Sequence, residues 1–213
     1  SSNVSKFVTN KKSTLAIRFP SHPIAINLLK KLKYPLAAPS ANISSKLSPV
    51  TKKHVEEEFG KKIKYVIEGG NSKIGLESTI INLTARPEIL RLGSLEISKL
   101  SKTLNSKLKF KKKGSLKVPG QNSLHYSPGI PLRMNCKNAN SDEAFILVKK
   151  RNKNDKNFFY LTTSGNLTEA AKNLYSTLRT VKKKGYKKIA VEKISNKGIG
   201  LAINDRLQKA STK

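Results

Sequence analysis

The stretch TEAAKNLYSTLRTVKKKGYKKIAV, residues 168–191, predicts a helix that leads through a tight turn into a strand. Apolar residues recur at helical spacing along residues 168–184, at Ala171, Leu174, Leu178 and Val181. Gly185 then ends the pattern, as glycine commonly does at a helix C-terminus. The short apolar run at residues 188–191 suits a buried strand. A helix followed by such a strand is typical of a parallel α/β sheet.

The sequence around this stretch predicts further elements of the same kind. Apolar runs at residues 144–148 and 158–161 indicate two strands before the helix, and residues 198–210 indicate a last helix. Strands and helices in this order predict a small Rossmann-like parallel α/β domain over residues 141–213.

The front part of the chain, residues 1–107, also alternates between predicted strands and helices. Apolar runs that suit strands occur at residues 15–18, 65–68, 79–83 and 89–91. Helical patterns occur at residues 24–32, 49–59 and 96–104. Ser48 and Pro49 are expected to open the second helix, and its three glutamates, residues 56–58, are expected on a solvated face.

Between the two parts the periodic pattern is lost. Lysine, glycine, serine and proline dominate, which predicts a linker over residues 108–140. This segment contains the aromatic pair His125 and Tyr126. The pair could close over a site as a lid and stack on a base, or it could anchor the linker to a domain.

Composition limits the classes of function. The chain carries 43 lysines and arginines against 13 acidic residues, a net charge of +30. This charge favours polyanionic partners such as tRNA or ATP, although lysines scattered along the whole chain also fit a solvated compositional bias. A single cysteine excludes an internal disulfide and a multi-cysteine zinc site, and it suits a reducing, cytoplasmic compartment. No apolar run approaches the roughly 20 residues of a membrane span.

Two loops contain side chains suited to anions. The loop APSANISSKLSP, residues 38–49, places hydroxyl groups before a predicted helix, where backbone N–H groups favour phosphate. Ser78 stands at the start of one predicted strand, and Arg91 at the end of the next could hold a phosphate through two hydrogen bonds. The plainer alternatives are ordinary turns and a surface arginine. No Walker loop, dinucleotide fingerprint or serine elbow occurs in the sequence.

Taken together and in order, several motifs resemble the YrdC-like threonylcarbamoyl-AMP synthases. The motifs are RFPSHP (18–23), PLAAPSAN (35–42), GLESTI (75–80), LRLG (90–93) and HYSP (125–128). NLYSTLR (173–179) and GIGLAINDRLQKA (198–210) resemble the C-terminal domain of the long, two-domain form. The resemblance implies an incomplete, twisted mixed sheet with helices in residues 1–107, followed by the linker and the Rossmann-like domain.

The resemblance also implies an activity. Members join L-threonine, bicarbonate and ATP, with Mg²⁺, into threonylcarbamoyl-AMP. A tRNA-modifying transferase complex then passes the threonylcarbamoyl group to tRNA, and direct tRNA contact by this chain is a further expectation. No covalent enzyme intermediate is implied, so catalysis is expected to rest on positioning and charge stabilisation.

Site residues follow from the same resemblance. The threonine pocket is expected at Arg18, the backbone of Ala38, and Ser78. ATP contacts are expected at Thr14, Ser40, Ser48 and Arg91. Tyr126 would cover the nucleotide, and Asn42 would hold the Ser40 loop in shape.

The sequence departs from the family pattern in two places. The family has further strands and an ATP-binding Lys-x-Arg motif ahead of the segment that matches Thr14, so a catalytic front part is expected to be missing. The linker reads PGQNSLHYSP (119–128), where the family has a basic, aromatic stretch before His-Tyr.

Two other hypotheses compete with the enzyme. A basic YrdC-like RNA-binding module without catalysis would use the +30 charge directly. A YrdC-like domain of a hydrogenase-maturation carbamoyltransferase would need zinc-type cysteine clusters, which one cysteine cannot supply.

Overall fold

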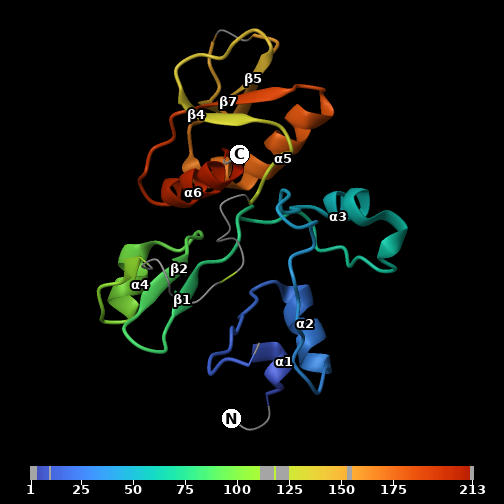
Figure 1. The fold of residues 1–213 in the computed structure, drawn as a ribbon, viewed down its shortest axis with the longest axis vertical. Coiled ribbons are helices and arrows are strands. Elements are labelled where there is room, and N and C mark those ends of the chain that lie inside the picture. The colour runs from blue at the N-terminus through green and yellow to red at the C-terminus, as the bar shows by residue number, and fades with distance from the viewer. Residues whose placement is uncertain (1–3, 10, 111–117, 119–124, 153–154, 212–213) are drawn as a thin grey trace. The chain divides into compact units, whose positions relative to one another are not determined.

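A computed structural model describes residues 4–9, 11–110, 118, 125–152 and 155–211 (Figure 1). The chain divides into two compact units, Ser1–Ser40 and Ala41–Lys213. The linker residues 111–117 and 119–124, including the Pro119-Gly120 step, lie outside the described residues.

The first unit contains two helices, α1 (Lys6–Thr9) and α2 (Pro23–Lys31). Pro23 suits the first turn of α2 because its missing N–H would have no partner within the helix. The helix expected at residues 24–32 is therefore confirmed, but none of its residues is buried.

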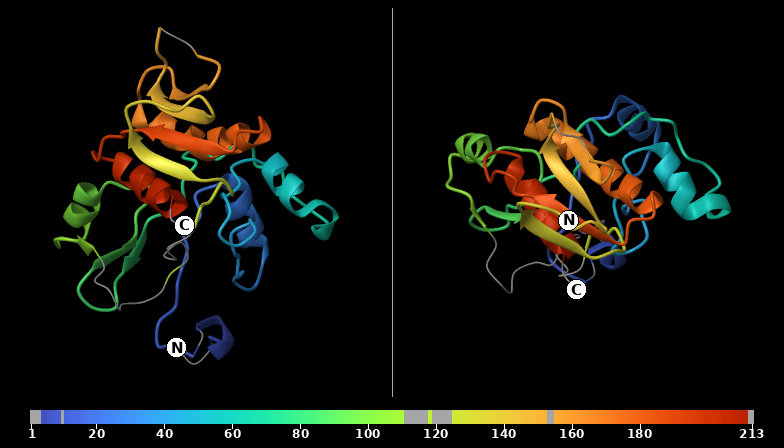
Figure 2. Two further views of the ribbon diagram at one scale, coloured as in Figure 1. Left: turned by 45° about the horizontal axis from the view of Figure 1, so that its top comes forward. Right: turned by 90° about the horizontal axis from the view of Figure 1, so that it is seen from above.

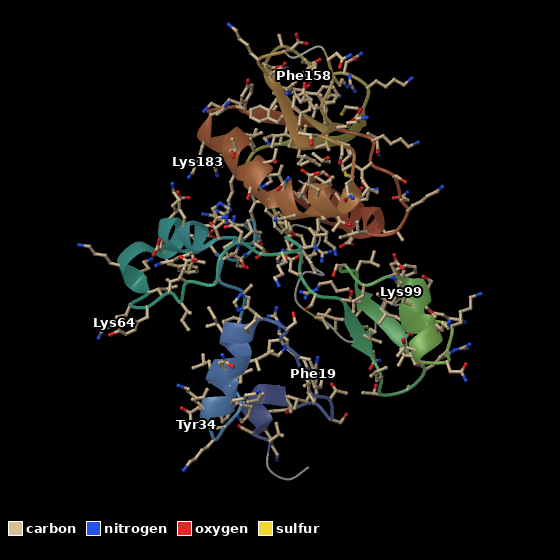
Figure 3. The ribbon with its side chains drawn as sticks, turned by 180° about the vertical axis from the view of Figure 1, so that it is seen from behind. Phe19, Tyr34, Lys64, Lys99, Phe158 and Lys183 are labelled. Carbon is tan, nitrogen blue, oxygen red and sulfur yellow. The ribbon has the colours of Figure 1, made fainter. Side chains whose placement is uncertain are left out.

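The strand expected at residues 15–18 is wrong. These residues have no regular secondary structure, and the side chains of Ile17 and Phe19 are 71% and 90% exposed (Figure 3). An extended apolar segment becomes a strand only when a neighbouring strand takes its backbone hydrogen bonds. No ladder with the described residues involves this segment.

The second unit opens with helix α3 (Lys52–Phe59) and the 3₁₀ turn η1 (Gly60–Lys62). The start of α3 differs from the expected one at Ser48 and Pro49. Thr51 is the N-cap, and its hydroxyl accepts a hydrogen bond from the backbone N–H of His54 at 3.1 Å. A threonine hydroxyl in this position satisfies one of the unpaired N–H groups at a helix start.

A small mixed sheet follows, with strand order β1-β2-β3. Its strands are β1 (Ile80–Asn82), β2 (Glu88–Arg91) and β3 (Lys109–Phe110). β1 and β2 are antiparallel, β2 and β3 are parallel, and helix α4 (Ile97–Thr103) connects β2 to β3. The expected mixed sheet is confirmed. The strand expected at residues 65–68 is wrong, and Tyr65 and Ile67 are exposed, for the same reason as in the first unit.

The C-terminal part is a parallel sheet of order β4-β7-β5-β6. Its strands are β4 (Leu132–Cys136), β5 (Glu143–Lys149), β6 (Phe158–Thr162) and β7 (Lys188–Glu192). Helices α5 (Leu167–Lys183) and α6 (Gly200–Ser211) lie on the same side of it (Figure 1, Figure 2). The expected Rossmann-like parallel domain is thus confirmed.

Alternation along the strands builds the core. Ala144 and Ile146 of β5 pack with the apolar faces of α5 and α6, whereas Phe145 and Leu147 face the opposite side of the sheet. Within the described parts of the chain, no helix is long and apolar enough to cross a bilayer.

Two strands occur where the composition predicted a linker. Both β3 and β4 fall within residues 108–140, and Leu108, Leu132 and Cys136 are buried. Proline, glycine and lysine around these short strands hid their apolar positions in the sequence. The boundaries at residues 107 and 140 stay a prediction.

Candidate functional site

Arg91 and Ser78 form a pair at the edge of the mixed sheet. Arg91 ends β2, and its Nε donates to the carbonyl oxygen of Ser78 at 3.0 Å, while its Nη2 donates to Ser78 Oγ at 3.1 Å. The antiparallel register, which sets Ile80 opposite Arg91, brings the two residues together. A guanidinium beside a hydroxyl group suits an anionic oxygen.

Glu77, directly before Ser78, gathers donors from three distant parts of the second unit. Ser48 Oγ donates to its Oε1 at 2.5 Å, the Tyr175 hydroxyl lies 3.1 and 3.2 Å from its two oxygens, and Arg206 Nε donates to Oε2 at 2.7 Å. Burial would raise the pKa of Glu77, but Arg206 and the Ser48 hydrogen bond outweigh it, so that the pKa is lowered. Glu77 is therefore an ionised, nearly buried carboxylate at neutral pH.

Arg206 of α6 is fully buried and binds on several sides. Its side chain is 0% exposed. It forms ion pairs with Glu77 and Asp205, and its Nη2 donates to the carbonyl oxygen of Leu92 at 2.6 Å. Burial alone would lower the pKa of Arg206, but the neighbouring carboxylate of Glu77 outweighs this effect, and the pKa is raised. The guanidinium therefore remains charged inside the protein.

Tyr126 is buried beside this ion pair. Its ring stacks on Tyr175, with ring centres 5.9 Å apart, and the Arg206 guanidinium carbon lies 4.9 Å from its centre. Burial raises the pKa of Tyr126 to about 12. The backbone N–H of Ser127 donates to the carbonyl oxygen of Ser45 at 2.9 Å. In this structure Tyr126 anchors its segment to α5 and α6, and a nucleotide could stack on the ring only after it is uncovered.

The loop before α3 is held by internal hydrogen bonds. Asn42 Nδ2 donates to the carbonyl oxygens of Ile43 and Lys46, at 3.0 and 3.2 Å. The backbone N–H of Ile43 donates to Glu58 Oε1 at 2.6 Å. These contacts fit the loop-shaping part expected of Asn42, which stays a prediction.

Glu58 corrects the expectation that residues 56–58 are all solvated. Its side chain is only 6% exposed and forms an ion pair with Arg179 of α5 at 2.9 Å. Arg179 also donates to the carbonyl oxygen of Leu47 at 2.7 Å. The last turn of α3 therefore contacts α5 through a largely buried charge pair.

Ser48 is placed differently from the sequence prediction. It does not start a helix, and its hydroxyl hydrogen is donated to Glu77. A phosphate oxygen only accepts hydrogen bonds, whereas a ribose hydroxyl can donate one. While the Glu77 contact lasts, Ser48 is therefore suited to a ribose rather than to a phosphate.

The nine expected site residues are divided between the two units. Asn42, Ser48, Ser78, Arg91 and Tyr126 belong to the second unit, and all but Asn42 gather around Glu77 and Arg206. The others lie in the first unit, where Thr14 is half-buried and Arg18, Ala38 and Ser40 are exposed. The union of both sets in one pocket stays a prediction.

Sequence reasoning missed the three residues that organise the second-unit cluster, Glu77, Tyr175 and Arg206. One signal was available for Arg206, which shares a helical face with apolar residues, Ala202, Ile203, Leu207 and Ala210. A charged side chain on such a face is expected to have a buried partner. The identity of that partner, 129 residues away, could not be read from the sequence.

The described residues contain no group of three or more histidine, cysteine, aspartate or glutamate side chains placed to hold a metal ion. The charged side chains of the cluster are two arginines, Arg91 and Arg206, and two carboxylates, Glu77 and Asp205.

Comparison with known proteins covers almost the whole chain. Residues 1–93 match the family described as "Telomere recombination", and residues 88–212 match the family of the threonylcarbamoyl-AMP synthase C-terminal domain. The Pyrococcus abyssi threonylcarbamoyl-AMP synthase is 34% identical over 98% of this chain and 67% of its own length. The Schizosaccharomyces pombe and Bacillus subtilis enzymes of the same name are 31% and 29% identical. The chain spans 60% and 65% of those two relatives.

Solved structures agree with the sequence matches. The crystal structure of Pyrococcus abyssi Sua5 complexed with L-threonine matches with a TM-score of 0.85 and 32% identity, over 99% of this chain and 68% of that one. A variant of that protein, with a histidine and a tyrosine replaced by alanine, matches with a TM-score of 0.81. These matches extend over both the mixed sheet and the parallel domain, and the chain belongs to the threonylcarbamoyl-AMP synthase family.

Proposed function

We propose that the protein to which this chain belongs makes threonylcarbamoyl-AMP from L-threonine, bicarbonate and ATP, for the threonylcarbamoyladenosine modification of tRNA. The observation that carries the proposal is the pairing of Arg91 with Ser78 at the sheet edge. A fixed cation beside a hydroxyl group is what binding of carboxylate and phosphate oxygens requires. Membership of the threonylcarbamoyl-AMP synthase family indicates which substrates these are.

The reaction is a nucleotidyl transfer. The threonine amine combines with bicarbonate to give a carbamate and water, and a carbamate oxygen attacks the α-phosphorus of ATP. The bond from that phosphorus to the bridging oxygen breaks, and pyrophosphate leaves. The carbamate and the triphosphate are both anionic, so the protein accelerates the transfer mainly by holding them in line and neutralising their charge.

We assign the residues as follows. Arg18 binds the threonine carboxylate, with the backbone of Ala38 and with Ser78. The ATP contacts come from Thr14, Ser40, Ser48 and Arg91, and Ser48 serves the ribose. Asn42 shapes the loop, and Tyr126 covers the nucleotide when its ring leaves Tyr175. Substrate oxygens then replace the Ser78 oxygens on Arg91 by shorter, charge-assisted hydrogen bonds.

Other components follow from the substrates. Mg²⁺ enters with ATP, because this ion prefers phosphate oxygens and retained waters with few protein ligands. The product is a mixed anhydride, so a transferase complex that delivers the group to tRNA is the natural acceptor. We place the protein in the cytoplasm, since its single cysteine is free.

The test uses the full-length gene product, including any residues encoded upstream of Ser1. Pyrophosphate release from ATP is measured with and without L-threonine and bicarbonate, for the wild type and for Arg91→Ala. We expect threonine-dependent release that the substitution lowers strongly. Release that is absent, or that ignores threonine, rejects the proposal.

The +30 charge favours a second function, a basic RNA-binding module without catalysis. An inactive full-length protein that prefers tRNA to other RNA would favour this alternative over the synthase.

A further inference from the structure

A single guanidinium lies between the two segments that present Ser78 and Arg91. Arg206 Nε donates to Glu77, the residue before Ser78, and Arg206 Nη2 donates to the carbonyl oxygen of Leu92, the residue after Arg91. Arg206 therefore binds both neighbours of the candidate site's central pair. It reaches them from α6, at the far end of the sequence.

The backbones of the two segments also contact each other directly. A Cβ atom added to Gly93 would lie 2.3 Å from the backbone nitrogen of Thr79 and 2.7 Å from the carbonyl oxygen of Glu77. The backbones therefore touch directly beside the guanidinium. Because a guanidinium is planar and rigid, bonds from two of its nitrogens fix the relative position of their acceptors.

The surroundings of Arg206 prevent other arrangements. Its side chain is fully buried, Asp205 pairs with Nη1, and Tyr126 covers its face. Replacing a buried ion pair by well-packed apolar residues is often neutral or even stabilising. The presence of Arg206 is therefore better explained by the positions that its bonds fix than by stability alone. Apolar side chains could fill the same space, but they would not fix the positions of Glu77 and Leu92.

We propose that Arg206 is a positioning residue for the adenylation site: it sets the distance between Ser78 and Arg91 through Glu77 and Leu92. The proposal rests on the function proposed above. It makes the C-terminal domain part of the catalytic machinery, because this domain supplies the group that holds the substrate-binding pair in register. Arg206 touches no substrate itself.

The first experiment compares Arg206→Lys and Arg206→Met in the full-length protein. Lysine keeps the charge beside Glu77 but cannot bond Glu77 and Leu92 as a fork. We expect a folded Arg206→Lys protein that melts below the wild type, because the partly buried Leu92 carbonyl oxygen loses its donor, and that has a clearly reduced kcat/KM for L-threonine and for ATP. For Arg206→Met we expect kcat/KM to fall about 100-fold, as when a reacting group is misplaced by about 1 Å.

A control at a second arginine–glutamate pair, whose arginine is 46% exposed, separates positioning from general stability. Arg133 also pairs with a buried glutamate, Glu143, at 2.6 Å, but its other contacts are with Cys136 and Asn138. None of these residues adjoins an expected site residue. Arg133→Met should therefore lower the melting temperature while kcat/KM of the folded protein stays at the wild-type value.

A double-mutant cycle tests the route of the effect. If Arg206 acts only through the Ser78–Arg91 pair, Arg206→Met should reduce kcat/KM little further in an Arg91→Ala background. Equal losses in both backgrounds would overturn the proposal, as would an Arg206→Lys protein with wild-type kinetics. An inactive wild type would instead reject the proposed function, so the two failures are distinguishable.

Discussion

At the scale of single residues, Gly75 marks the closest approach of the GLESTI segment to α5. Its φ is +77°, and an added Cβ would lie 2.6 Å from the Cα and carbonyl oxygen of Lys172. Gly70 has a similar φ of +70° but nothing within 4 Å of the corresponding position. Comparing substitutions at the two glycines therefore distinguishes the cost of backbone strain from the cost of a steric clash.

We expect Gly75→Ala to lower the free energy of unfolding clearly more than Gly70→Ala does. Strain alone at a positive φ is expected to exceed about 1 kcal/mol, and both variants share it. The clash with the α5 backbone is added only at Gly75, because backbone atoms cannot move aside as a flexible side chain can. Equilibrium denaturation in urea measures the difference. Equal losses for the two variants would contradict the close approach.

Glu143 predicts a dependence of stability on pH. The hydrogen bond from Arg133 lowers the pKa of Glu143 to about 2, from the ordinary value of 4.5 for a glutamate. A carboxyl group whose pKa is lowered by folding stabilises the protein above its unfolded pKa. Its contribution is lost as the pH falls toward the folded pKa. The pair should therefore stabilise the fold fully above about pH 5 and progressively less down to about pH 2.

The variant Glu143→Gln checks this dependence. We expect it to melt below the wild type at pH 7, with a gap that narrows steadily as the pH is lowered from 5 to 3. Melting curves by circular dichroism at each pH provide the measurement. A gap that stays constant over this range would mean that the ionised carboxylate adds nothing to stability.

Residue-scale prediction from the sequence was limited by distance along the chain. Ser78 and Arg91 could be selected because a hydroxyl group at a strand start and an arginine at a strand end are locally recognisable. Glu77 stands beside them in the same motif, yet its partners Ser48, Tyr175 and Arg206 come from three other elements. Only the packing of α5 and α6 against that motif shows why a carboxylate is needed.

At the scale of elements, α5 begins with a well-formed cap. The Asn166 side chain accepts hydrogen bonds from the backbone N–H groups of Thr168 and Glu169, at 2.8 and 3.1 Å. Asn166→Ala should lower the free energy of unfolding by about 1 kcal/mol. Asn166→Asp keeps the acceptor and adds a negative charge at the helix N-terminus, so it should match the wild type or exceed it. Equilibrium denaturation of the three proteins tests this, and equal destabilisation by both substitutions would contradict the cap.

Helices whose apolar residues show a local periodic pattern were predicted well, whereas strands that depend on pairing with another strand were not. The apolar residues of α5 recur at helical spacing, and the helix is stabilised by hydrogen bonds within the segment. Its bounds could therefore be predicted to within about one residue. The apolar runs at residues 15–18 and 65–68 look equally like strands, but a strand exists only beside another. Conversely, β4 exists because β7 pairs with it, although its sequence lies among linker-like residues.

At the scale of the whole molecule, the excess of lysine is the dominant property. Several surface cations have acidic partners, as in Lys183 with Glu57 and Lys188 with Asp142. With 43 basic and 13 acidic residues, most cations cannot be matched in this way. Lys64, Lys99 and Lys183 project from three different elements or loops (Figure 3), and of these Lys99 and Lys183 pair with Glu96 and Glu57. Lysines spread in this way suit a diffuse field better than one binding face.

A diffuse field predicts RNA binding without sequence preference. We expect the protein to bind a tRNA and an unrelated RNA of equal length with similar affinities at low salt. Both affinities should fall steeply and in parallel as salt rises, because each neutralised phosphate releases a counterion. Filter binding or fluorescence anisotropy at several salt concentrations gives the two slopes, with an unrelated protein of similar lysine content as the control. A preference for tRNA that persists at high salt would require base or shape contacts. It would show that part of the lysine excess forms a specific surface, and in that case the chain would bind tRNA directly.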